Sequence, residues 1–347
     1  MTVLRRLSIS LVLLCLSLWI IPEAYGADQV RVLLKQEYDR AYFSVIEGDY
    51  LLIDGGTGLP VAMPLPGEQW TVFLEGLTLK AQRTGDSTAL SFTGGALLAA
   101  QGGSEAFFRF GNNSYPGDLH FIGLNDRMLV VNSVNLEDYL IGVLAEEMSG
   151  ALPMEALKAQ AVVSRTLATY RKSPSPYYAL PAQVNAQLYR GYDRKLSYYD
   201  NLRAAVAATE GEKIFYDGSL IEAVFHANAG GMTASSEDVW GGKRPYLQSV
   251  ASPFDVYALE YPKQSGGWPA NSYEWSKSYS RIELSGKIAE WSRTNPDEAI
   301  SIGTVLELRP HAENSQVSSP GRVTHLDIIG TLGTVTVSGE NARQIID

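Results

Sequence analysis

The sequence predicts an α+β fold, with mostly antiparallel strands and a helical pair that carries the candidate catalytic motif. Between residues 29 and 131, short apolar or alternating segments are separated by glycine and proline, which is typical of antiparallel strands joined by turns. From Asn135 the pattern changes to that of two consecutive helices, and alternating segments return toward the C-terminus. Helices inserted between runs of strands indicate the α+β class.

Residues 1–26 have the order of an export signal. Arg5 and Arg6 form a basic start, an uncharged and mostly apolar run extends from Leu7 to Ile21, and Ala24-Tyr25-Gly26 places small residues at the cleavage positions. The run is shorter than the roughly 20 residues that span a bilayer. We therefore expect cleavage before Ala27 and an exported protein, with a retained membrane anchor as the alternative.

Composition excludes several classes of function. Cys15 is the only cysteine and leaves with the signal, so the mature chain would have no disulfide, no thiolate metal site and no cysteine nucleophile. The formal net charge is −10 and no basic run is present, so nucleic acid is not expected as a partner.

The pattern of residues 27–114 predicts a β-rich N-terminal module, in which we find no catalytic motif. Its expected strands are Val30–Leu34, Tyr42–Ile46, Tyr50–Asp54, Trp70–Leu74 and Leu90–Thr93. We expect it to serve packing or surface contact. A second α+β unit is expected over residues 115–347, with its core motif at residues 134–255.

Two helices begin this core motif. Asn135 can cap the first helix, with Asp138 placed as in a capping box, and the helix is expected to end at about Met148. Pro153 suits the first turn of a second helix that runs to about Arg171.

Alternation returns after the helical pair. The expected strands are Glu212–Tyr216, Leu220–His226, Val305–Leu308, Val323–Ile329 and Thr334–Ser338, with a further helix over Ser280–Trp291.

One carboxylate lies on the apolar face of the first helix. At about 100° per residue, Glu147 falls at the centre of a stripe made by Leu136, Leu140, Val143 and Leu144. Burial and the negative end of the helix dipole would both raise the pKa of this side chain. A glutamic acid that stays protonated near neutral pH can act as a general acid. The alternative is that Glu147 reaches solvent at the helix end and pairs with a lysine.

Several spaced blocks follow one another in a recognisable order. Within Val134–Tyr170 they are Glu137, Tyr139–Val143, Glu147-Met148, Pro153–Ala161 and Arg165-Thr166. The blocks Ala186–Tyr189 and Phe225–Thr233 come next. Together they closely resemble the stage II sporulation protein D family, which includes the amidase enhancers of autolysin operons.

The resemblance implies a chemistry. Active members of the family are lytic transglycosylases that cut peptidoglycan glycan strands with a 1,6-anhydro product, and their catalytic glutamate corresponds to Glu147. No cofactor is implied. Some members hold zinc with His and Cys ahead of the Gln-x-Tyr block. Here Ala186 replaces the cysteine and residues 173–185 contain neither His nor Cys, so we expect no metal.

Eight further residues of the matching blocks are candidate substrate contacts: Lys158, Arg165, Gln187, Tyr189, His226, Gly230, Gly231 and Thr233. Each has a structural alternative. Lys158 and Arg165 can belong to a solvated helix face, Tyr189 can pack in the core, and His226 can be structural. Asp238 and Asp255 are candidate supporting acids.

Two other functions remain open. The main alternative is a non-enzymatic, wall-binding protein that stimulates a wall amidase, its β-rich first third being the contact surface. The other is a two-carboxylate hydrolase in which Glu146 or Asp238 assists Glu147, which would leave reducing ends on its products.

Overall fold

The computed structural model describes residues 29–37, 40–102, 106–182, 187–260, 273–274, 276–311 and 321–346. The expected signal peptide at residues 1–26 lies outside this part of the chain. Among the described residues, no helix has the length and apolar character needed to cross a membrane.

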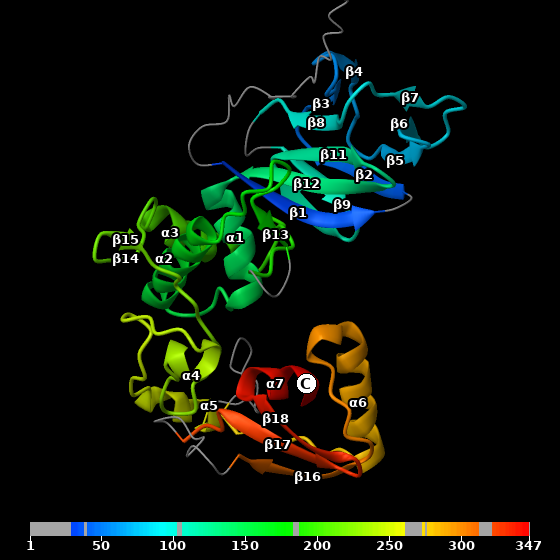
Figure 1. Cartoon of the computed structure of the whole chain (residues 1–347). Coiled ribbons are helices and arrows are strands. Elements are labelled where there is room, and N and C mark those ends of the chain that lie inside the picture. The colour runs from blue at the N-terminus through cyan, green and yellow to red at the C-terminus, as the bar shows by residue number, and fades with distance from the viewer. Residues whose placement is uncertain are drawn as a thin grey trace, which may run out of the picture.

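Two mostly antiparallel sheets form the upper part of the molecule (Figure 1). One has the order β13 (Leu180–Pro181), β1 (Gln29–Glu37), β12 (Arg127–Asn135), β11 (Asp118–Leu124), β8 (Ala96–Ala100), β3 (Tyr50–Asp54) and β4 (Pro60–Ala62). The other has the order β10 (Asn113–Pro116), β9 (Phe107–Phe110), β2 (Arg40–Glu47), β5 (Gln69–Glu75), β6 (Thr78–Arg83) and β7 (Leu90–Ser91). Strand β13 pairs in parallel with β1, and the other pairings between the named strands of these two sheets are antiparallel.

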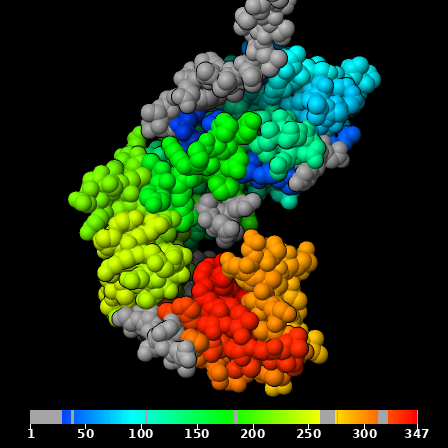
Figure 2. Space-filling view, in the orientation of Figure 1, coloured from blue at the N-terminus to red at the C-terminus, as the bar shows by residue number. Residues whose placement is uncertain are grey.

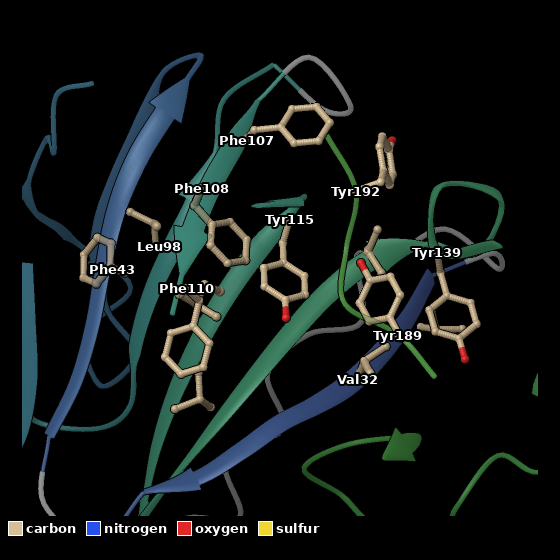
Figure 3. Packing of buried hydrophobic residues seen from close by; sticks show 14 of the residues in the cluster. Val32, Phe43, Leu98, Phe107, Phe108, Phe110, Tyr115, Tyr139, Tyr189 and Tyr192 are labelled. Carbon is tan, nitrogen blue, oxygen red and sulfur yellow. The ribbon is translucent and has the colours of Figure 1, made fainter. Parts of the chain in front are cut away.

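The core between these sheets is built by alternation along each strand. In β2, Phe43 is buried whereas its neighbour Tyr42 is exposed. The Phe43 ring lies 5.6 Å from the ring of Phe121, which belongs to the other sheet. Figure 3 shows the aromatic and aliphatic side chains that continue this core.

The first sheet crosses the boundary that we expected between residues 114 and 115. Strands β11 and β12 follow that boundary, yet β11 pairs with β8 and β12 pairs with β1. The reason is a long-range pairing: Gln29 lies opposite Asn135. The N-terminal strands and the helical core motif therefore share one sheet.

Helix α1 (Leu136–Glu147) starts directly after β12, and α2 (Met154–Tyr170) and α3 (Tyr199–Ala208) pack against it and against each other (Figure 1). The expected helical pair is confirmed. Asn135 caps α1 by accepting the Glu137 backbone N–H at 2.8 Å. Asp138 accepts the Tyr192 hydroxyl at 3.2 Å rather than completing a capping box. The apolar stripe of α1 is buried, as its spacing predicts.

Shorter elements follow, namely β14 (Phe215–Tyr216), β15 (Ser219–Leu220), α4 (Ser236–Trp240), a 3-10 turn (Pro253–Val256) and α5 (Tyr257–Glu260). The expected strand Leu220–His226 is wrong beyond Leu220. Its alternating burial is real, since Ile221 and Ala223 are buried. Packing and side-chain contacts hold this segment in place. Alternating burial alone does not distinguish such a segment from a strand that is hydrogen-bonded in a sheet.

The C-terminal part has a core of its own. Helix α6 (Arg281–Thr294), a 3-10 turn (Pro296–Glu298), strands β16 (Val305–Pro310), β17 (His325–Gly330) and β18 (Gly333–Ser338), and helix α7 (Gly339–Ile346) surround it. The expected strands and helix are present here, while α7 was not expected. Figure 2 shows an open recess between the green helical group and these orange and red elements.

A core truncation tests the two-sheet packing. Replacing Leu98, which is fully buried in β8, by alanine leaves a cavity and is expected to lower the free energy of unfolding by about 2–5 kcal/mol. Urea denaturation followed by circular dichroism measures this loss. The control is Leu77→Ala at a position that is 84% exposed, where a change within about 0.5 kcal/mol is expected. Equal losses for both variants would contradict the packing.

Candidate active site

Glu147 is the last residue of α1, and its side chain is exposed rather than buried. The expectation that the apolar stripe buries it is therefore wrong. The stripe ends at Leu144, and the chain leaves the helix in an extended conformation at Met148. The carboxyl nevertheless has a defined partner, because its Oε1 atom accepts the Leu188 backbone N–H at 3.3 Å.

The surroundings still favour the neutral form of this carboxyl. Partial removal from water raises the pKa of Glu147, the Leu188 N–H lowers it, and the nearby charge of Glu146 raises it, for a net increase. Glu146 is in turn paired with Arg190 at 3.2 Å. An accessible carboxyl with a raised pKa is suited to proton transfer.

Gln187 and Tyr189 lie on either side of Leu188, and both are buried. The Tyr139 hydroxyl donates to Gln187 Oε1 at 3.1 Å, and Gln187 Nε2 donates to the Ser164 carbonyl at 3.0 Å. Both side chains therefore lie in the interior, in agreement with core packing of Tyr189. In this geometry neither side chain is placed to contact a sugar directly.

Arg165 also lies inside the protein, with none of its side chain exposed. Its guanidinium forms a two-pronged ion pair with Glu137, with a 2.8 Å bond from Nε, and donates to the backbone carbonyls of Val206 and Glu212. The expected substrate contact of Arg165 is thereby replaced by a structural role. Lys158 is the accessible member of the pair and bonds to Glu155 at 2.7 Å.

The Gly230–Gly231 turn is built as a separate unit. Both glycines have positive φ, 68° and 97°, which explains the residue type. Asp255 Oδ2 accepts the backbone N–H groups of Ala229 and Gly231 at 3.0 and 3.1 Å. The expected supporting acid is therefore an anchor of this turn.

Neighbouring residues complete this unit. The Thr233 hydroxyl accepts the Val250 N–H at 2.9 Å and donates to the Gln248 carbonyl, whereas His226 is exposed. Arg322 donates to the carbonyls of Ala229 and Met232, which joins the C-terminal part to the turn. In the described part of the chain, separate sets of hydrogen bonds hold this turn and Glu147.

Sequence reasoning missed a charged cluster at the end of α2. Glu222 accepts two hydrogen bonds from Arg171, at 2.8 and 3.0 Å, and forms an ion pair with Arg244. Arg244 also approaches the hydroxyls of Tyr170 and Tyr246. The cluster ties the 220–246 segment to α2. Its members are far apart in sequence and share no local pattern, so no signal predicted it.

No group of three or more metal-binding side chains occurs among the residues that the structure describes. Ala186, on which the expectation of no zinc partly depends, lies outside these residues.

Comparisons with known proteins agree with the expected resemblance. Residues 124–216 match the family model for the stage II sporulation protein. Stage II sporulation protein D of Bacillus subtilis is 30% identical over 203 residues, which cover 54% of each chain. The amidase enhancer of Bacillus subtilis is 37% identical over 205 residues, 59% of this chain and 26% of that protein. An uncharacterized protein of Brachyspira hyodysenteriae is 37% identical over 197 residues, 56% of this chain and 50% of its own length. The matched region thus spans about half or less of these relatives.

The structural role of Arg165 is open to a stability test. Arg165→Met leaves Glu137 without its partner and removes donors from two backbone carbonyls, so the free energy of unfolding is expected to fall by about 3–5 kcal/mol. The matched control is Lys158→Met, whose ion pair is at the surface and is worth less than about 1 kcal/mol. Chemical denaturation compares the two variants. A loss for Arg165→Met as small as that of the control would contradict the structural role of Arg165.

Proposed function

We propose that this chain, which carries a stage II sporulation protein domain over residues 124–216, is an exported peptidoglycan lytic transglycosylase with Glu147 as its acid/base. The stage II sporulation protein and amidase-enhancer relatives support a role in the cell wall. The observation that carries the enzymatic assignment is the Glu147 carboxyl, which is accessible, hydrogen-bonded by the Leu188 N–H and raised in pKa.

The proposed reaction requires only one carboxyl. Protonated Glu147 gives its proton to the glycosidic oxygen between N-acetylmuramic acid and N-acetylglucosamine, and the bond from C1 to that oxygen breaks. The carboxylate then accepts the proton of the muramic acid C6 hydroxyl while the C6 oxygen bonds to C1. The products are a 1,6-anhydromuramyl end and a free glucosamine 4-hydroxyl, and no water is consumed. Glu147 finishes the cycle in its protonated state.

The two candidate partners for a hydrolytic mechanism have other roles. Glu146 is paired with Arg190. Asp238 accepts the Ser235 hydroxyl at 2.9 Å at the start of α4. Neither residue therefore supplies a second free carboxylate that could activate a water. This favours the single-carboxyl reaction over hydrolysis.

A non-catalytic function has one observation in its favour. The relative from Bacillus subtilis that is 37% identical carries the name amidase enhancer. On that alternative the protein binds glycan strands and stimulates a wall amidase without cutting glycan. Both functions require export, for which we propose the signal at residues 1–26 and cleavage before Ala27.

Product analysis decides between the two functions. Purified protein is incubated with intact sacculi and with glycan strands stripped of stem peptides, and products are identified by mass spectrometry. We expect anhydromuramyl ends from the wild type and a loss of about 10²–10⁴ in rate for Glu147→Gln. The control is Glu290→Gln on α6, an exposed carboxylate, for which no change is expected. Wild-type protein that sediments with the sacculi but forms no anhydro products would establish a binding protein instead.

The pH profile tests the electrostatics of the site. A general acid works in its protonated form, so kcat/KM should fall as pH rises through the pKa of Glu147. The negative charge of Glu146 raises that pKa. Glu146→Gln removes the charge and leaves Arg190 unpaired, and both changes favour ionised Glu147. The alkaline limb of kcat/KM is therefore expected to move to lower pH. A limb that moves to higher pH, or stays in place, would contradict this assignment of the proton donor.

A further inference from the structure

Residues Gln187–Tyr192 run against helix α1 and contact it at both ends and in the middle. We call this segment the strap. It meets the last turn of α1 through Leu188 and Arg190, and the first turn through Tyr192. The strap therefore spans the length of the helix that ends at Glu147.

Close approach between strap and helix depends on Gly142. A β-carbon at this position would lie 2.7 Å from Cε2 of Tyr189 and 2.9 Å from the carbonyl oxygen of Gly191. Neither contact fits an ordinary side chain, and the second one involves backbone. Glycine is unfavourable inside a helix, so its presence at the centre of α1 is explained by this contact.

Buried side chains fix the strap next to Leu188. Gln187 bonds to Tyr139 and to the Ser164 carbonyl, which joins the strap to α1 and α2. The Tyr189 hydroxyl donates to Asn132 Oδ1 at 2.8 Å, which joins it to β12. Figure 3 shows the Tyr189 ring between the rings of Tyr115 and Tyr139, with centroids 5.7 and 4.8 Å away.

The far end of the strap is bonded to strand β10 and to the first turn of α1. The Tyr192 backbone N–H donates to the Ser114 carbonyl at 2.9 Å, and its hydroxyl donates to Asp138. Gly191 has a φ of 65° and passes so close to Ser114 that a β-carbon would lie 2.0 Å from its carbonyl oxygen. With both ends and the centre fixed, the backbone at Leu188 has a defined direction.

We propose that the strap, which approaches α1 at Gly142 and is anchored by Gln187 and Tyr189, positions the Leu188 amide so that it binds Oε1 of Glu147 and leaves Oε2 to carry the transferable proton. This proposal rests on the proposed function for the use of that proton. In a neutral carboxyl the carbonyl oxygen is a stronger acceptor than the hydroxyl oxygen, so an N–H bond to Oε1 favours the tautomer with the proton on Oε2. The 3.3 Å contact is long, as such bonds often are before substrate binds.

Other charged groups around Glu147 do not replace this effect. Glu146 on α1 opposes ionisation of Glu147, and Arg190 on the strap is paired with Glu146. Tyr139 of α1 is also close, since the Glu147 charge raises the pKa of its hydroxyl. On α2, Lys158 is paired with Glu155. The Leu188 N–H is the contact that favours the ionised form of Glu147.

The test measures the titration of Glu147 directly, by carbon NMR of the labelled carboxyl, and activity separately. Leu188→Pro removes the N–H donor, so the titration midpoint of Glu147 should rise relative to Leu188→Ala, which keeps the donor. Gly142→Ala pushes the strap away without changing Glu147 or Leu188, and should move the midpoint in the same direction. Its matched control is Gly286→Ala in α6, where a β-carbon meets open space and the midpoint should stay unchanged.

Activity adds a second readout. For Gly142→Ala we expect kcat to fall on the order of 10- to 100-fold with little change in KM, because the proton donor is misdirected while glycan binding is kept. The alkaline limb should move with the NMR midpoint. An unchanged midpoint in Gly142→Ala, with folding confirmed by circular dichroism, would overturn the proposal. A shifted midpoint in a protein whose wild type makes no anhydro products would support the positioning and refute the transglycosylase assignment.

Discussion

The close contact between helix α1 and the strap is the constraint on which the candidate site depends. A carboxyl at the exposed end of a helix has no packed surroundings of its own, so its position follows from the backbone that reaches it. That backbone can approach because residue 142 has no side chain. Helix α1 starts directly after β12, and the strap is bonded to β12 and β10. Strand β12 therefore sets the start of the helix, β12 and β10 together set the course of the strap, and helix and strap meet at Glu147.

Three polar residues of the matching blocks support this arrangement from inside the protein. Arg165, Gln187 and Tyr189 are buried, and each is hydrogen-bonded to another element. Burying such groups is costly unless they find partners, and a network that satisfies them favours a single packing over its alternatives. A sequence motif shared by a family can therefore preserve the geometry of a site through residues that never touch the ligand.

Local signals allowed a large part of the fold to be predicted. The Asn135 cap, the apolar stripe of α1 and the strand alternation all depend on residues near one another, and these features are present. Long-range contacts were not accessible in this way. The pairing of Gln29 with Asn135, which carries the first sheet across the expected boundary, leaves no local pattern. Helical spacing likewise located Glu147 on the stripe, but it did not reveal that the helix ends before burial is complete.

This incomplete burial is compatible with the size of the proposed substrate. A small molecule can enter a closed pocket, where desolvation raises the pKa of an acid strongly. A glycan strand is a polymer, and an acid that acts within it must remain accessible from the surface. Glu147 combines exposure with a pKa that is still raised, because partial desolvation and Glu146 outweigh the Leu188 hydrogen bond. Substrate binding would remove further water from the carboxyl and so favour the protonated form at the moment when the proton is needed.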